Sequence, residues 1–280
     1  MKRSFDCFCL VLAGVLGSAD AARASGHGPA FGHATPTNPK GGWSVDLGLM
    51  GRHGGGTTGS MMRAILGYGI TEDVKVMASA PAVFQTDVLA PGRVASLTSM
   101  QGDFEGIAQW RFHRQDTGVG SRFESTVSAG VIVPGPQEGA FDSGPGIYSG
   151  VVTGFASRSH YLWGGVSYSA FLESEGDRRP GVVFYSAVYG YRPQSWRTDY
   201  PRWDWRLFGE FTGERTGAVR KLGVTLPGTE AHQMFFGPSA LGVYKAYAVS
   251  AGIQFPVYRS VPRVFPRERF RWSVNFAYFF

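Results

Sequence analysis

The sequence predicts an all-β protein, an antiparallel transmembrane β-barrel of about twelve strands with both termini in the periplasm. Three observations support this prediction. Segments in which apolar and polar side chains alternate with a period of two recur along the chain. The polar side chains of these segments include charged ones, and an export signal precedes the first segment. A soluble sandwich would also contain alternating strands, but it would have to bury the charged row in a dry core.

The first 24 residues have the features of a secretory signal peptide. Lys2 and Arg3 provide the positive charge, and residues 8–17 form an apolar stretch that is too short to span a bilayer as a helix. Two A-x-A sites leave cleavage after Ala21 and cleavage after Ala24 both open. Both cysteines lie within the signal, so we expect the mature chain to have no disulfide, cysteine metal site or cysteine nucleophile.

The composition agrees with an exported barrel and does not indicate a nucleic-acid partner. Charged residues make up 17% of the chain, below the ~25% of an average globular domain, whereas aromatic residues reach 14%. The mean hydropathy of -0.09 resembles that of a soluble protein, but a barrel hides its apolar side chains in alternation. The net charge of +6 comes without a basic stripe, so we expect no nucleic-acid binding.

Residues 25–41 are rich in glycine and proline and predict an irregular, flexible segment before a barrel at residues 42–280. His27 and His33 lie in this segment, but two loosely held histidines do not make a metal site. We therefore expect no metal and no cofactor. The sequence leaves open whether the segment plugs the lumen or hangs in the periplasm.

The strand prediction rests on alternation between apolar side chains and polar or small ones, which lie on opposite faces of a strand. The pattern is clearest in the fourth, fifth and last segments and weakest in the third, which contains Pro81. Ten or fourteen strands would also fit. In chain order the segments cover residues 43–50, 63–70, 74–84, 103–113, 122–133, 146–157, 160–171, 181–192, 203–214, 233–244, 247–257 and 270–280.

Long and short connections alternate between the predicted strands. With a periplasmic N-terminus, odd-to-even connections form outer loops and even-to-odd connections form short periplasmic turns. Two connections depart from this rule, a short outer one at residues 54–59 and a long inner one at residues 193–202. The long outer connections are residues 86–99, 134–145, 172–180, 215–232 and 259–268.

The polar row is predicted to line a wet lumen, while the apolar row faces lipid. Acids and bases are nearly balanced in this row, which favours pairing across the lumen and weak ion selectivity. Such a lumen suits small neutral or hydrophobic solutes. The predicted lumen-lining residues are Asp46, Arg63, Asp103, Glu105, Arg111, Arg122, Glu124, Asp204, Arg206, Glu210 and Arg271.

Tryptophan side chains near strand ends are predicted to anchor the barrel at the two membrane interfaces. These residues are Trp43, Trp110, Trp163, Trp203 and Trp272.

The last strand ends on an aromatic residue. Phe276, Tyr278 and Phe280 lie on one face, and only Phe279 departs from the alternation. This ending resembles the C-terminal signature of bacterial outer-membrane barrels, which the barrel-assembly machinery recognises. The resemblance implies the outer membrane as location, and its lipids and the assembly machinery as partners. The oligomeric state stays open.

Six short motifs resemble, in order, those of a family of outer-membrane proteins named for the MetA pathway of phenol degradation. The resemblance spans most of residues 40–280 and implies passage of small, often aromatic or hydrophobic compounds across the outer membrane. It implies no catalytic residues. The motifs are Gly102-Asp-Phe with Trp110-Arg-Phe, Val131-Ile-Val-Pro-Gly135, Gly190-Tyr-Arg-Pro193, Phe208-Gly-Glu-Phe-Thr-Gly-Glu214, Phe236-Gly-Pro-Ser-Ala-Leu-Gly242 and Ala251-Gly-Ile-Gln-Phe-Pro-Val257.

An enzymatic role is not favoured. Outer-membrane phospholipases are also twelve-stranded and use a serine with a histidine near the outer rim. His53 and His232 could lie there near Ser60 or Ser239, but the sequence contains no G-x-S-x-G nucleophile elbow. We therefore expect a channel without catalytic residues. A hydrolase of the phospholipase type and a structural or adhesion barrel with a filled lumen are the alternatives.

Overall fold

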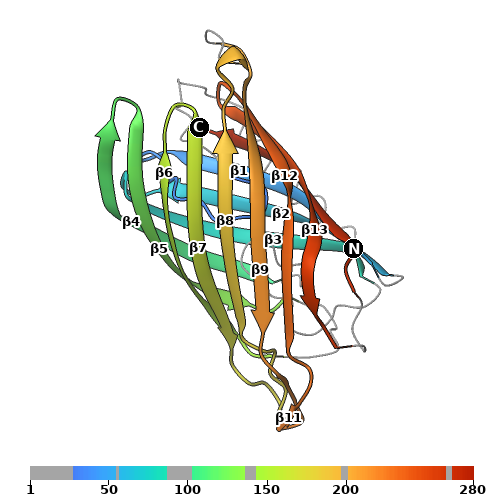
Figure 1. Cartoon of the computed structure of the whole chain (residues 1–280). Helices are drawn as coiled ribbons and strands as arrows, with labels where there is room; N and C mark the ends of the chain where they lie inside the picture. The colour runs from blue at the N-terminus through green and yellow to red at the C-terminus, as the bar shows by residue number, and fades with distance from the viewer. Residues whose placement is uncertain (1–27, 55–56, 87–102, 136–142, 197–200, 263–266) are drawn as a thin grey trace.

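The computed structural model describes residues 28–54, 57–86, 103–135, 143–196, 201–262 and 267–280. They form a closed antiparallel barrel of twelve strands in which each strand pairs with its neighbours along the chain (Figure 1). The predicted fold class and strand count are therefore confirmed. The predicted signal peptide lies outside the described residues. Among the residues described, no helix is long and apolar enough to cross a bilayer.

The barrel strands cover the predicted segments and extend several of them by a few residues. A short 3-10 helix, η2 (Gln194–Trp196), lies in the connection between β8 and β9, and the hairpin of β10 (Val219–Lys221) and β11 (Val224–Leu226) lies between β9 and β12. The barrel strands are β1 (Trp43–Gly54), β2 (Thr57–Gly69), β3 (Val74–Thr86), β4 (Phe104–Gly118), β5 (Ser121–Val133), β6 (Gly146–Ala156), β7 (His160–Phe171), β8 (Val182–Tyr191), β9 (Asp204–Thr216), β12 (Ala231–Tyr244), β13 (Tyr247–Ser260) and β14 (Phe270–Phe279).

The first and last strands close the barrel. They pair from Ser44 with Phe279 to His53 with Phe270, and the amide N–H of Trp43 donates to the carbonyl oxygen of Phe280 at 2.8 Å. Because the strand number is even, β1 begins and β14 ends at the same end of the barrel. This short-turn end carries the tight connections β4–β5, β6–β7 and β12–β13, and the opposite long-loop end carries the β10–β11 hairpin (Figure 1). The predicted alternation of loop lengths is confirmed.

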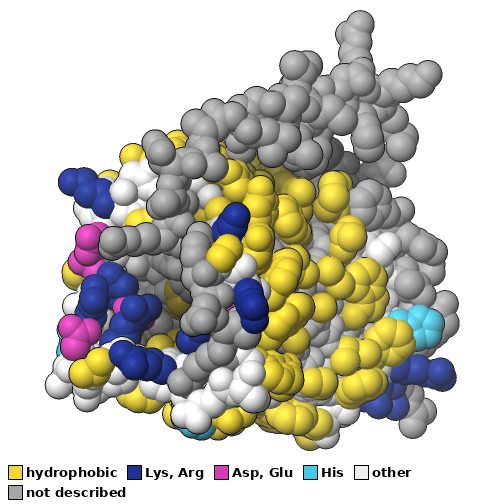
Figure 2. Space-filling view, turned by 90° about the horizontal axis from the view of Figure 1, so that it is seen from above, with side chains coloured by type: hydrophobic (Ala, Val, Ile, Leu, Met, Phe, Trp, Pro, Cys, Tyr) yellow, Lys and Arg dark blue, Asp and Glu magenta, His cyan; other side chains and the backbone are white. Residues whose placement is uncertain are grey.

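Apolar side chains cover the outside of the barrel. On β4, Trp110 is 54% exposed, whereas its neighbours Gln109 and Arg111 are buried, as period-two alternation requires. Figure 2 shows a broad field of hydrophobic side chains on one face, with basic and acidic side chains gathered at its edge. A barrel with an apolar outer face and a polar interior reverses the arrangement of a soluble protein. Its outer face is suited to contact with lipid.

The interior also holds two apolar clusters that the predicted polar row did not include. One consists of Ile107, Ile132, Tyr148, Phe171, Val182 and Phe184. The other consists of Tyr161, Trp163, Val188, Phe208, Leu241, Ala248, Ala277 and Phe279.

The prediction that Trp163 anchors a membrane interface is wrong. Trp163 is only 2% exposed and lies in the second interior cluster. The reason is the phase of β7, in which Tyr161 and Trp163 face inward and Leu162 faces outward. Phe279, which departs from the apolar alternation of the last strand, also faces inward and packs in this cluster.

Loss of Phe280 should reduce insertion of the barrel into the outer membrane. Deleting the residue removes the main-chain hydrogen bonds to Trp43, and Phe280→Ser removes only the ring, which stacks on Tyr278 with centroids 5.5 Å apart. We expect less heat-modifiable, folded protein in the outer membrane for both variants, while removal of the signal peptide proceeds normally. Unchanged levels of folded protein would contradict a role for this residue in assembly.

Candidate functional site in the barrel lumen

Residues 28–42 form the lumenal segment, of which residues 28–38 lie inside the barrel and residues 39–41 are exposed at its short-turn end. They form no helix or strand, as predicted, and Phe31, Thr35 and Asn38 are buried. The sequence left open whether this part of the chain lies in the lumen or in the periplasm, and the structure places residues 28–38 in the lumen. Instead of a flexible tail, the structure contains a segment that is held by hydrogen bonds along its length.

The start of the lumenal segment is bound to β9. The backbone N–H groups of Ala30, Phe31 and Gly32 donate to the carboxylate oxygens of Glu210 at 2.8, 2.8 and 2.7 Å. Glu210 is one of the predicted lumen-lining residues. Gly252 of β13, on the same wall of the barrel, leaves room for Phe31, since an added Cβ there would lie 2.7 Å from the Phe31 ring. The inner wall is therefore shaped to receive this part of the segment.

From β9 the lumenal segment crosses the lumen. The N–H of His33 donates to Ser186 Oγ of β8 at 2.9 Å, and its Nε2 lies 3.1 Å from Ser167 Oγ of β7. Thr35 Oγ1 then donates to Glu124 of β5 at 3.2 Å. The segment thus contacts four strands of the barrel wall, β9, β8, β7 and β5.

The far end of the lumenal segment is fixed at the short-turn end. Thr37 Oγ1 donates to the carbonyl oxygen of Glu72 at 2.8 Å, and the N–H of Gly41 donates to the carbonyl oxygen of Gly69 at 2.7 Å. Gly41 has a φ of +75°, a left-handed conformation that glycine adopts without strain and that turns the chain into β1. The chain therefore enters β1 directly from the lumen.

The predicted lumen-lining charges lie inside the barrel, where most of them form ion pairs. Arg63 and Glu105 are both buried, and Arg63 Nη1 lies 2.9 Å from Glu105 Oε2. Arg179 of the β7–β8 connection pairs with Asp103 at 2.8 Å. Asp46 lies on the cavity wall together with Lys75.

Glu124 joins two arginines to the lumenal segment. Its carboxylate lies 2.7 Å from Arg111 and 3.1 Å from Arg122, and it also accepts the hydroxyl of Thr35. Arg111 in turn lies 2.7 Å from Asp73. At the same short-turn end, Asp204 pairs with Arg192 at 2.6 Å and with Arg206 at 3.3 Å.

Arg271 of β14 is the centre of a second group of ion pairs. Its guanidinium lies 2.6 Å from Glu214 and 3.0 Å from Glu268, and 3.5 Å from the centre of the Phe235 ring. The predicted set omitted Glu214 and Glu268, as well as Arg179 and Lys75. Glu214 could have been found from the alternation of β9, whereas Glu268 and Arg179 lie in connections where no alternation operates.

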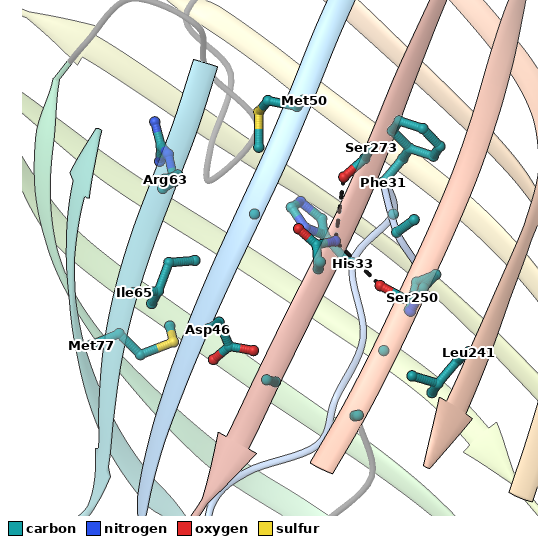
Figure 3. A pocket seen from close by; sticks show the side chains of 18 of the residues that line it. Phe31, His33, Asp46, Met50, Arg63, Ile65, Met77, Leu241, Ser250 and Ser273 are labelled. Carbon is teal, nitrogen blue, oxygen red and sulfur yellow. Dashed lines mark hydrogen bonds between the residues drawn. The ribbon is translucent and has the colours of Figure 1, made fainter. Parts of the chain in front are cut away.

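Two cavities lie on either side of the lumenal segment. The first, of about 260 Å³, is lined by residues 28–33 and by residues of seven strands, among them Asp46, Met77 and Asn275 (Figure 3). The second, of about 520 Å³, lies at the short-turn end and is lined by Thr35 and Pro36 together with inner side chains of β4, β5 and β9. The lumenal segment therefore contributes to the lining of both cavities.

Three of the residues considered for a hydrolase have other partners in the structure. His232 Nε2 lies 2.8 Å from the Tyr185 hydroxyl, Ser239 donates to Glu210, and His53 packs against the ring of Phe270. Within the described ranges, no group of three or more His, Cys, Asp or Glu side chains could hold a metal ion.

No protein-family model matches the sequence, and no curated protein matches it. Solved structures do share its architecture. An outer membrane channel from Pseudomonas putida F1 is 11% identical, with a TM-score of 0.61 over 87% of this chain and 97% of that one. The chain has the fold of an outer-membrane barrel. A second similar structure, the NanC porin, is 8% identical, with a TM-score of 0.52 over 84% of this chain and 98% of that one. At these identities the likeness concerns the fold alone.

Proposed function

We propose that the protein is an outer-membrane channel for small neutral or hydrophobic compounds. The carrying observation is the pairing of opposite charges around two cavities inside a closed barrel. The fold that the chain shares with an outer membrane channel and a porin supports this proposal. We further propose that the chain is exported by its signal peptide and inserted by the barrel-assembly machinery.

Charge pairing argues against ion transport. A pore that prefers one sign of ion carries a ring of charges of the opposite sign at its constriction. In this lumen, Arg63 is neutralised by Glu105, and Arg271 by Glu214 and Glu268. The lumenal segment narrows the path further. These features favour a low conductance with little preference between anions and cations.

The first cavity favours solutes that have an apolar part. Met50, Met77 and Leu241 contribute apolar surface, while Ser250 and Asn275 contribute hydrogen-bonding groups. The resemblance of the sequence motifs to the MetA-pathway family favours aromatic compounds within this class. We propose transport without a catalytic step; in support of this, His232 and Ser239 lie seven residues apart on β12 and are bound to Tyr185 and Glu210.

Removal of residues 25–36 should raise the single-channel conductance, since it removes from the lumen the residues of the segment that line both cavities. The measurement is a planar-bilayer recording of purified mature protein under a salt gradient. The intact protein should show a small conductance and a reversal potential near zero. Heat-modifiable migration of the deletion variant serves as the control for folding.

Two outcomes would overturn the proposal. A large and strongly ion-selective conductance of the intact protein would exclude a channel for neutral solutes. Absence of conductance after the deletion, in a barrel that is still folded, would favour a filled barrel with a structural or hydrolytic role.

A further inference from the structure

We propose that Glu210 is the latch of this channel, and that residues 30–32 form a carboxylate-binding nest whose resident ligand is the Glu210 side chain. The inference rests on the proposed channel function and adds a device that sets the position of the lumenal segment. Glu210 is a positioning residue in this proposal, because it acts on solutes through the segment it holds.

The contacts of Glu210 are unusual in number and direction. Three consecutive backbone N–H groups, those of Ala30, Phe31 and Gly32, converge on its two carboxylate oxygens. Consecutive N–H groups that point to one centre form an anion-binding nest. Ser239 Oγ is a fourth donor, and the backbone carbonyl of Glu210 accepts from Gln254 Nε2 at 3.3 Å. The carboxylate is fully buried among these groups.

These hydrogen bonds hold the first half of the lumenal segment more strongly than its other contacts do. Hydrogen bonds to an ionised carboxylate are about twice as strong as those between neutral groups. The neighbouring contacts of His33, to Ser186 and Ser167, join neutral groups. The contact of Thr35 with Glu124 is longer, at 3.2 Å, and Glu124 also binds Arg111 and Arg122.

The position of the latch decides what its release would open. Residues 28–33 line the 260 Å³ cavity, whereas residues 37–42 are tied to the short-turn end by separate hydrogen bonds. Loss of the latch therefore frees residues 28–32, while the hydrogen bonds of His33, Thr35 and Thr37 keep the rest of the segment attached. The freed residues are no longer fixed against the first cavity, which widens the path along it.

Glu210→Ala tests the latch directly. We expect its conductance to rise toward that of the protein that lacks residues 25–36, because the three donors lose their acceptor. Glu210→Gln is the second variant. It keeps the volume of the side chain but offers the nest one neutral oxygen, so its conductance should lie between the wild-type and deletion values. Glu173→Ala removes a carboxylate outside the lumen, where Glu173 pairs with Arg220, and should leave the conductance unchanged.

A variant on the segment makes the test independent of the barrel wall. At Gly32, an added Cβ would overlap Cγ2 of Val188. Gly32→Leu should therefore push the nest away from Glu210 without changing any strand. We expect the same rise in conductance, with the heat-modifiable migration of the wild type.

Acetate distinguishes a carboxylate-binding nest from a merely structural contact. Truncation of Glu210 to alanine removes a group of the size and charge of acetate, so acetate from solution can fill the vacant nest. In Glu210→Ala, replacing chloride by acetate at equal ionic strength should lower the conductance beyond the lowering seen in the deletion variant. The deletion variant, which has no nest, is the control that shows how much of the decrease in conductance comes from the lower mobility of acetate.

The outcomes separate this inference from the proposed function. If the deletion raises the conductance while folded Glu210→Ala and Glu210→Gln keep the wild-type value, the latch is excluded and the channel stands. If Glu210→Ala opens but acetate acts on it only as on the deletion variant, the carboxylate nest is excluded. If the deletion itself opens nothing, the channel proposal fails first. Should Glu210→Ala not fold, Glu210→Gln decides whether the latch exists.

Discussion

Replacing Arg271 by methionine should lower the free energy of unfolding by about 3–5 kcal/mol, the cost typical of removing one partner from a buried ion pair. The guanidinium of Arg271 lies between Glu214 and Glu268, and all three side chains are buried. Without it, two carboxylates would remain in the interior, and Arg52 would be the neighbouring charge for Glu268. Methionine fills similar volume, so the loss would report on charge and not on packing.

The measurement is urea unfolding of the purified protein in lipid vesicles, followed by the heat-modifiable band. Arg122→Met is the matched control, because the Arg122 side chain is 40% exposed and its partner Glu124 keeps Arg111. We expect its cost to stay below ~1 kcal/mol, as for exposed ion pairs. Adding Glu214→Gln to Arg271→Met should restore part of the lost stability. Equal losses of unfolding free energy for Arg271→Met and Arg122→Met would show that water screens the ion pairs of Arg271 as much as those of the more exposed Arg122.

Alternation predicted the strands, because each face of a strand meets one environment, and the charged row and the export signal then favoured a membrane barrel over a soluble sandwich. Arg63 and Glu105, for example, are neighbours across β2, β3 and β4, and both were assigned to the lumen from period-two spacing within their own segments. Their pairing with each other could not be predicted, since it depends on the register between strands.

The phase of a strand is lost where both faces are apolar. In β7, Tyr161 and Trp163 face inward and Leu162 faces outward, yet all are hydrophobic. In such a strand hydrophobicity cannot show which row of side chains faces the interior. The assignment of Trp163 to the interface was wrong for this reason. The same ambiguity hid the two apolar clusters of the interior.

The lumenal segment has no periodicity from which its position could be predicted. Its strongest contacts join residues that are far apart in sequence, such as Ala30 and Glu210, which are separated by 180 positions. Glycine and proline predict irregular structure equally well in a free tail and in a bound segment. Only the three-dimensional arrangement shows that Glu210 meets three backbone N–H groups.

Val127→Arg should impair folding far more than Thr126→Arg, although the two positions are adjacent. Val127 is 37% exposed on the outer face in the middle of β5, and Thr126 is 1% exposed on the inner face. An arginine on the lipid face near the bilayer midplane costs about 2–4 kcal/mol. At Thr126 the new charge would enter the lumen, beside the ion pairs of Glu124.

The two variants should also affect different properties of the protein, which are the conductance in Thr126→Arg and the folding yield in Val127→Arg. The hydroxyl of Thr126 donates to the carbonyl oxygen of Thr35 at 3.3 Å, so a larger side chain there displaces the lumenal segment and leaves the strands in place. We therefore expect Thr126→Arg to yield a folded barrel with a raised conductance, and Val127→Arg to yield little folded protein. The yield of heat-modifiable protein and planar-bilayer recording check these two expectations. Equal folding yields, or a lower yield for Thr126→Arg, would mean that the outer face of β5 does not meet lipid.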